Sequence, residues 1–174
     1  MRRLTLAAVL MAAIAAPACR YSRASRERAS INDSEPVSIV NVADPRADFQ
    51  LTKGFWTVES GAWRWTMKNF TVALKPPAGS AEKGAALELK FTIPEVMFNR
   101  VGPMTVDAHI NGQDLGSETY PSAGSFTYRR DVPAAVLGTP VVAVDFSVDK
   151  GLPPGQQDTR ELSLIVTSIG LLPK

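Results

Sequence analysis

Apolar and polar residues alternate with a period of two in several segments of this chain. In segment 87–93 every second residue is apolar: Leu87, Leu89, Phe91 and Ile93. Successive side chains of a β-strand point to opposite faces, so this pattern predicts a strand with one buried and one solvent-facing side. The same alternation occurs at 106–110, 142–148 and 162–166. Weaker candidates bring the expected total to about nine strands: 37–42, 54–59, 62–66, 69–75 and 125–131.

Turn residues separate these segments, and helical periodicity is nearly lacking. Asn111-Gly112 follows one strand and predicts a tight hairpin turn, because both residues tolerate positive φ. Segment 134–137 predicts one helical turn, and no other part of 36–174 shows a period of 3.6. Short strands without intervening helices predict an all-β fold, an antiparallel β-sandwich or barrel. Segment 141–148 is apolar at nearly every residue, so we expect it at the centre with both faces covered.

The first 18 residues have the pattern of a signal peptide. Arg2 and Arg3 precede an apolar stretch, 4–16, which ends in the small residues Ala16-Pro17-Ala18. Thirteen helical residues extend only ~20 Å, whereas the hydrocarbon core of a bilayer is roughly 30 Å thick. We therefore expect residues 1–18 to be cleaved during export.

Cys19, the only cysteine, directly follows this segment. Ala16-Pro17-Ala18-Cys19 resembles the lipobox of bacterial lipoproteins, which implies that Cys19 is lipidated and holds the protein at a membrane. The alternative is ordinary cleavage after Ala18, which leaves a free thiol. Residues 19–35 are basic and lack apolar periodicity, so we expect a flexible tether before a folded domain at 36–174.

Charge and composition exclude several classes of protein. The whole chain has a net charge of +2, but residues 36–174 contain 13 Lys and Arg against 14 Asp and Glu. A nucleic-acid partner is therefore not expected, since the folded part carries no basic excess. One Cys and one His exclude a disulfide framework and a Cys/His zinc site within one chain. No phosphate-binding loop or dinucleotide fingerprint is present, and we expect no cofactor and no metal.

The three tryptophans lie within ten residues of one another. Trp63 and Trp65 are two apart and share a face of a strand, while Arg64 points to the opposite face. Flat indole rings stack on the apolar faces of sugars, and charged neighbours bind sugar hydroxyls. Equally, large aromatic residues fill the core of a small sandwich. Both interpretations stay open for Trp63 and Trp65, and Trp56 can be either exposed or buried.

These motifs resemble a bacterial β-sandwich domain found beside glycosyltransferases and in envelope-polysaccharide proteins. The resemblance rests on Gly54-Phe55-Trp56-Thr57-Val58-Glu59, on Trp63-Arg64-Trp65-Thr66, and on Asp158-Thr159-Arg160-Glu161-Leu162-Ser163 with Ser168-Ile169. It implies a jelly-roll or galactose-binding-like fold, similar to carbohydrate-binding modules, and a glycan context. The matched residues that have the polarity for a ligand site are Trp56, Glu59, Arg64, Arg160 and Glu161.

The charged residues of this set also allow a structural role. Ion pairs Glu59–Arg64 and Arg160–Glu161 would either clamp a loop or present charges to a ligand. His109 is expected on the solvent-facing side of its strand, and the chain lacks a Gly-x-Ser-x-Gly motif. The chain is therefore predicted to be non-catalytic. A glycoside hydrolase or a structural Ca²⁺ site would need the acidic residues Asp145, Asp149, Asp158 and Glu161.

Together these patterns predict a non-catalytic protein of the bacterial cell envelope, lipid-anchored through Cys19 or secreted. Its β-sandwich would recognise a glycan or a glycan-handling partner. The alternative is an assembly lipoprotein that binds an envelope protein through a sheet edge or exposed aromatic residues. Trp56 on a concave sheet face beside Arg and Glu would favour sugar, and a flat apolar patch would favour protein.

Overall fold

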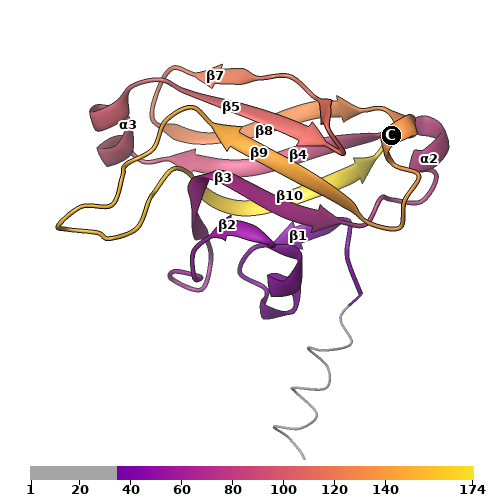
Figure 1. Cartoon of the computed structure of the whole chain (residues 1–174), viewed down its shortest axis with the longest axis horizontal. Helices are drawn as coiled ribbons and strands as arrows, with labels where there is room; N and C mark the ends of the chain where they lie inside the picture. The colour runs from indigo at the N-terminus through magenta and orange to yellow at the C-terminus, as the bar shows by residue number, and fades with distance from the viewer. Residues whose placement is uncertain (1–34) are drawn as a thin grey trace, which may run out of the picture. The chain divides into compact units, whose positions relative to one another are not determined.

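The computed structural model describes residues 35–174 (Figure 1). The predicted signal peptide, Cys19 and almost all of the predicted tether lie outside these residues. In the described part no helix has the length and apolarity needed to cross a membrane. Its ten strands are all paired in antiparallel fashion, which confirms the all-β, antiparallel prediction.

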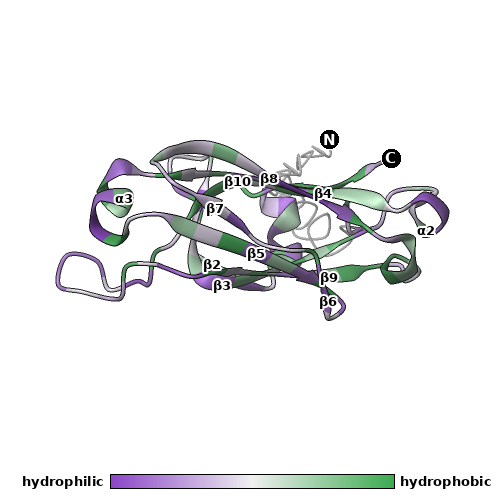
Figure 2. Ribbon diagram, turned by 90° about the horizontal axis from the view of Figure 1, so that it is seen from above, coloured by the Kyte–Doolittle hydropathy of each residue, from purple (hydrophilic) through white to green (hydrophobic). Residues whose placement is uncertain are grey.

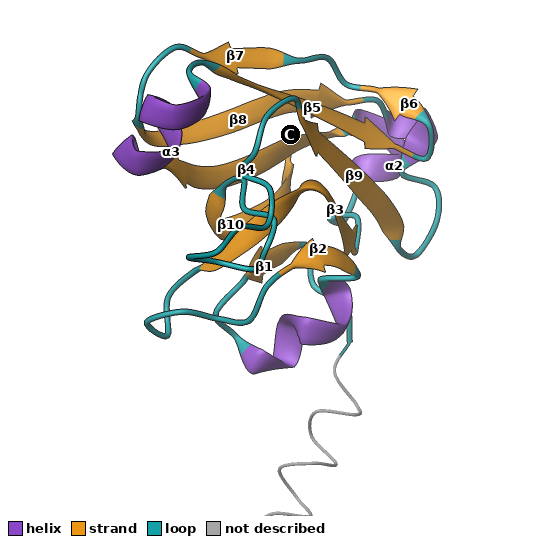
Figure 3. Ribbon diagram, turned by 60° about the vertical axis from the view of Figure 1, so that its left-hand side comes forward, coloured by secondary structure: helices purple, strands orange, loops and turns teal. Residues whose placement is uncertain are grey.

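The strands form two layers that share one long strand. The first layer contains β1 (Ile39–Asn41), β10 (Ile165–Pro173), β4 (Ala85–Ile93) and β8 (Gly124–Val132). The second contains β2 (Lys53–Phe55), β9 (Val142–Val148), β5 (Met104–Ile110), β6 (Gln113–Asp114) and β7 (Glu118–Tyr120). Strand β3 (Arg64–Leu74) joins them, because its first residues pair with β10 and its later residues pair with β9 (Figure 3).

The core lies between these two layers, which Figure 2 shows edge-on. Burial alternates along β5 and β9, where every second residue is buried. Tyr128 of β8 contacts Phe146 of β9 with ring centroids 6.3 Å apart, and Phe91 of β4 contacts Tyr120 of β7 at 4.9 Å. Each large apolar side chain buried in this way contributes roughly 1.5–3 kcal/mol. Period-two patterning therefore builds a β-sandwich.

The structure corrects three details of the strand prediction. Segments 62–66 and 69–75 belong to one continuous strand, β3. The last strand begins at Ile165 and not at Leu162, because Leu162 forms an isolated bridge with Leu152 instead. Strand β9 lies between β5 and β3 as expected, but only one of its faces is covered. Ala143, Asp145 and Ser147 are exposed on the other face.

Short elements account for the other main differences, and the two short strands β6 and β7 were not predicted. The 3₁₀ turn η2 (Ala134–Val136) confirms the helical turn expected at 134–137. Three further helices were not predicted: η1 (Pro45–Gln50), α2 (Ser80–Lys83) and α3 (Glu95–Val101). Helices of four to seven residues make two turns at most, so their apolar positions do not repeat often enough to show a period.

Candidate functional site

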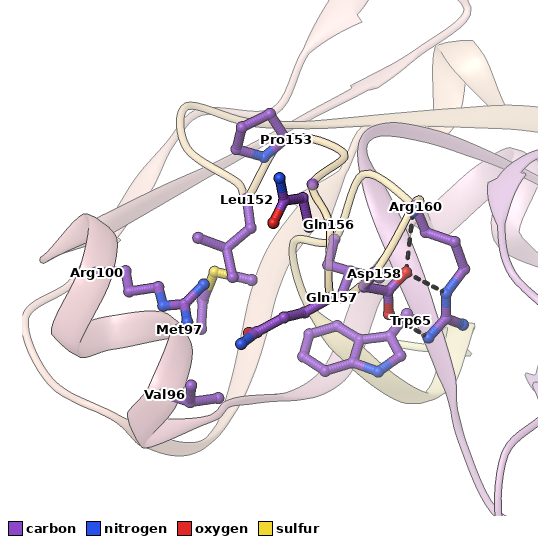
Figure 4. Close-up of a pocket in the computed structure, with 12 residues that line it drawn as sticks. Trp65, Val96, Met97, Arg100, Leu152, Pro153, Gln156, Gln157, Asp158 and Arg160 are labelled. Carbon is purple, nitrogen blue, oxygen red and sulfur yellow. Dashed lines mark hydrogen bonds and ion pairs between the residues drawn. The ribbon is translucent and has the colours of Figure 1, made fainter.

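A cleft of about 450 Å³ lies between helix α3 and the loop that connects β9 to β10 (Figure 4). The β3 residue Trp65 contributes an indole ring to it. Apolar and polar groups both line the cleft: Trp65, Val96, Met97, Arg100, Leu152, Pro153, Gly155, Gln156, Gln157, Asp158, Arg160 and Leu162. An aromatic ring surrounded by a few polar side chains is the usual composition of a small-ligand site.

Helix α3 forms one wall of the cleft and is fixed by its buried face. It begins after Pro94 and ends at Gly102, whose φ of 72° lets its N–H bond the carbonyl oxygen of Phe98 (2.8 Å). Met97 is fully buried in the core, whereas Arg100, three residues further along, is exposed at the cleft. Burial of Met97 therefore determines the direction in which Arg100 is presented.

The opposite wall is the loop 149–164, which is held at its base. Leu152 and Leu162 exchange backbone hydrogen bonds of 2.8 and 3.0 Å, and Ser163 Oγ donates to the carbonyl oxygen of Lys150 (3.0 Å). Further out, the N–H of Gly155 bonds the carbonyl oxygen of Asp158 (2.7 Å). These bonds form a closed base below an exposed tip, Pro153 to Gln157.

Arg160 connects this loop to the segment around Trp56. Its guanidinium forms ion pairs with Asp158 (2.9 Å) and Glu59 (2.7 Å) and lies 5.7 Å from the centroid of the Trp56 ring. Hydrogen bonds from Arg160 lower the pKa of the Asp158 carboxyl, and those two carboxylates raise the pKa of Arg160. Arg160 is thus held in place by two carboxylates of the protein.

Trp56 and Trp65 are both half-buried, and each packs against the core. The Nε1–H of Trp56 donates to the carbonyl oxygen of Glu161 (2.8 Å), so Trp56 does not stand free on a concave sheet face. Trp65 lines the cleft and meets Trp63 edge to face, with ring centroids 6.1 Å apart. Trp63 and Trp65 therefore share a face, as predicted, and it is Trp65 that faces the candidate site.

Arg64 and Glu161 hold backbone groups together. Arg64 Nε donates to the carbonyl oxygen of Val42 (2.7 Å), Nη1 to that of Trp56 (3.2 Å), and Nη2 to the Asp48 carboxylate. Glu161 Oε1 accepts the N–H of Lys68 (2.8 Å). The predicted ion pairs Glu59–Arg64 and Arg160–Glu161 are therefore wrong. The pairs formed are Arg160–Glu59 and Arg64–Asp48.

Of the five residues predicted for a ligand site, only Arg160 lines the cleft. Trp56, Glu59 and Glu161 do not line it: Glu59 pairs with Arg160, Trp56 bonds the carbonyl oxygen of Glu161, and Arg64 bonds that of Trp56. Sequence reasoning missed Arg100 and the glutamines of the loop. The only available signal was the loop itself, 151–158, since surface loops often carry binding residues.

The four carboxylates considered for hydrolysis or Ca²⁺ binding do not gather at one place. Asp145 accepts the Thr71 hydroxyl, Asp149 accepts the Thr105 N–H, Asp158 pairs with Arg160, and Glu161 accepts the Lys68 N–H. Among residues 35–174, the group of side chains close enough to share a metal ion is Asp107, His109 and Asp114. The His109 side chain is 42% exposed, on the solvent-facing side of β5 as predicted.

Comparison with known proteins gives matches to solved structures alone. No family model matches the chain, and no curated protein matches it. It is similar to a CBM36-1 domain of a multidomain xylanase from the hindgut metagenome of Trinervitermes trinervoides. Identity is 12%, the match covers 78% of this chain and 96% of that domain, and the TM-score is 0.43.

Two other similar structures differ greatly in length. A carbohydrate-binding module CBM36, solved with calcium and xylotriose, is 10% identical, with 78% and 99% coverage and a TM-score of 0.40. Dimeric latent PorU from Porphyromonas gingivalis is 9% identical, with a TM-score of 0.42, and the match covers 60% of this chain and 10% of PorU. Two of these three structures are carbohydrate-binding modules. The sandwich assignment itself rests on the strand pairing.

Proposed function

We propose that the domain 36–174 is a glycan-binding module and that sugar binds in the cleft beside Trp65. The observation that carries the proposal is the composition of this cleft. An anchored aromatic ring lies there with guanidinium, amide and carboxylate groups from two separate elements. Sugar rings have apolar faces and polar edges, so a binding site for them needs both kinds of group close together.

The two arginines of the cleft have different roles in this proposal. Arg160 is fixed by Asp158 and Glu59 and serves to order the loop. Arg100 takes part in no ion pair with any of residues 35–174, so its donors are available to a ligand. With Gln156 and Gln157 it would bind sugar hydroxyls or a sugar carboxylate, while Trp65 stacks on the ring.

We further propose that the module is non-catalytic. Asp158 is the one carboxylate that lines the cleft among the described residues, and it is paired with Arg160. Glycoside hydrolysis by the usual route needs two carboxyl groups flanking the scissile bond. The pairing with Arg160 lowers the pKa of the Asp158 carboxyl. A general acid has to be protonated near the working pH, so this pairing favours a binding role for Asp158.

The context proposed for this module is the bacterial cell envelope. Residues 1–18 have the pattern of a signal peptide and Cys19 follows them directly, which supports a lipid anchor or secretion. Palmitate labelling of cells that express the wild type or the Cys19→Ser variant tests this part separately. We expect label on the wild type alone, and equal labelling of both chains would contradict the anchor.

A glycan array tests the binding proposal. The full chain is applied in detergent beside a Trp65→Ala variant and a Phe49→Ala control, in which a 47% exposed aromatic residue outside the cleft is removed. We expect the wild type and Phe49→Ala to bind the same saccharides and Trp65→Ala to lose them. If no saccharide binds, or if all three chains bind alike, the proposal is wrong.

A second candidate function, binding of an envelope protein, is favoured by the edge strand β1. Two apolar residues at or next to it are exposed, Val37 at 45% and Ile39 at 52%. Unpaired strand edges with apolar side chains can accept a strand from another protein. Both backbone groups of Val37 are already bonded by Gln50 and Lys75, so Ile39 is the point on this edge where a strand would add. An Ile39→Lys variant that loses a partner in envelope pull-downs while Trp65→Ala keeps it would support this candidate over glycan binding.

A further inference from the structure

Asp107, His109 and Asp114 lie close together on the solvent-facing side of the second layer. They belong to β5 and β6, two strands that contribute no residue to the cleft. Asp107 and His109 are two apart on β5 and so point to the same side. The Asn111-Gly112 turn, with φ of 49° and 81°, closes the β5–β6 hairpin and places Asp114 directly opposite His109. Directly opposite residues of antiparallel strands have Cβ atoms roughly 5 Å apart, so the three side chains can meet.

The distances among these side chains suit a shared ion. One ligand atom from each residue lies within 4.8 Å of the other two. Asp107 Oδ1 is 3.1 Å from His109 Nδ1, while the 4.0 Å contact of Asp114 Oδ1 is with the other ring nitrogen, Nε2, and an ion binds only one of the two. Ligands about 2.0 Å from a tetrahedral zinc ion are separated from one another by roughly 3.3 Å. Asp114 Oδ1 accepts the N–H of Gly116 (2.7 Å), so this 65% exposed side chain has to turn to close the remaining gap.

Asp107 Oδ1 gives an independent indication of a missing partner. This oxygen is buried, yet it has no hydrogen bond from any described residue, since its contact with His109 lacks hydrogen-bond geometry. A buried carboxylate oxygen without a partner is costly, and native structures normally supply a partner, water or an ion. The side chain as a whole keeps 30% of its exposure, so an ion can approach it from solvent.

The charge around His109 is also uncompensated. Asp145 of β9 lies opposite His109 on its other side. None of Asp107, Asp114 and Asp145 forms an ion pair with a Lys or Arg of residues 35–174. Three carboxylates thus surround one imidazole without a basic side chain, and a divalent cation would neutralise them.

We propose that Asp107, His109 and Asp114 form a binding site for Zn²⁺. Imidazole and carboxylate are both good zinc ligands, and three protein ligands leave one position for water. One Cys and one His exclude a zinc site built from these two residue types alone. This site differs because the aspartates supply two of its three ligands. Bound zinc would fasten β6 to β5. The proposal is independent of glycan binding.

Isothermal titration of ZnCl₂ into the untagged full chain tests the site. The Cys19→Ser background removes the only thiol, which would otherwise bind zinc itself. We expect one zinc ion per chain, and affinities at least ~10-fold weaker in His109→Gln and Asp107→Asn. Asp131→Asn, which removes an exposed carboxylate of β8, is the matched control and should bind as the parent does.

The imidazole of His109 provides a second readout that does not depend on the variants folding. It is the only histidine of the chain, so imidazole ¹H–¹⁵N correlations report on this residue alone. Zinc should shift these signals in a saturable way and should raise the thermal midpoint of the parent chain. Unshifted imidazole signals, or zinc binding that is equally strong in His109→Gln, would overturn the proposal.

Discussion

Single side chains decide the shape of the cleft wall through the groups they contact. Arg160 joins Asp158, Glu59 and the Trp56 ring, and Glu161, the next residue, accepts the N–H of Lys68. Two neighbouring residues thus fasten the loop to two different segments, Arg160 to the segment around Glu59 and Glu161 to β3. The sequence motif around Asp158-Thr159-Arg160-Glu161 indicated important residues, and the structure places Asp158 and Arg160 in the cleft wall, while Glu161 bonds the backbone of β3.

The Asp158–Arg160 pair predicts a specific dependence of stability on pH. Because the pKa of Asp158 is lowered in the folded state, its pairing stabilises the fold above pH ~4 and loses this effect as pH falls further. Asp158→Asn should therefore unfold at a lower temperature than the wild type at pH 6. By pH 3 the difference between their thermal midpoints should have shrunk. A difference that stays constant across this range would contradict the assignment.

Tyr128 predicts a change at the alkaline end. It is fully buried, its O–H donates to the carbonyl oxygen of Gly116, and burial raises its pKa to about 12. The stability that it contributes is complete below pH ~10 and declines as pH rises toward 12. Tyr128→Phe should lose about 1 kcal/mol in urea unfolding at pH 7. It should also show a smaller further loss between pH 10 and 12 than the wild type does.

Among the elements, β2 depends most visibly on one residue. Gly54 lies at the irregularity in the β2–β3 pairing with a φ of 76°, and a Cβ there would come 2.2 Å from the carbonyl oxygen of Asn69. Phe55, its neighbour, packs on Phe70 with ring centroids 5.3 Å apart. Only glycine allows β2 to approach β3 this closely, and the loop that carries Trp56 follows directly.

Gly54→Ala should therefore destabilise the protein much more than an ordinary glycine substitution. We expect a loss of about 3 kcal/mol in the free energy of unfolding, from the positive φ and the clash with backbone together. Gly61→Ala is the control, because Gly61 has a φ of 62° with open space around it. It should lose about 1 kcal/mol. Equal losses in urea titrations would show that the close approach is unimportant.

Strands could be predicted from the sequence far better than helices. The alternation in 87–93, 106–110 and 142–148 reports directly which face is buried, and β4, β5 and β9 follow it. Helix α3 gave no such signal, because a seven-residue helix buries only Met97 fully. The apolar run at 141–148 suggested two covered faces, but the exposed Ala143 of β9 shows that an apolar residue can also face solvent.

At the scale of the whole molecule, the cleft arises where three distant segments meet. Trp65 comes from β3, Arg100 from α3, and Asp158 from the loop before β10. Spacing along the chain contains no information on this meeting, so the sequence indicated Trp65 and Arg160 as candidates but not Arg100 or the loop glutamines. The fold class needed only local patterning, whereas the site needed the three-dimensional arrangement of non-local segments.

Isothermal titration of the strongest array saccharide against wild type, Trp65→Ala and Phe49→Ala tests glycan binding in the cleft most directly. The account predicts that Trp65→Ala weakens the affinity by at least ~10-fold, about 1.4 kcal/mol, and that Phe49→Ala stays within about twofold of the wild type. Wild-type affinity in Trp65→Ala would contradict it.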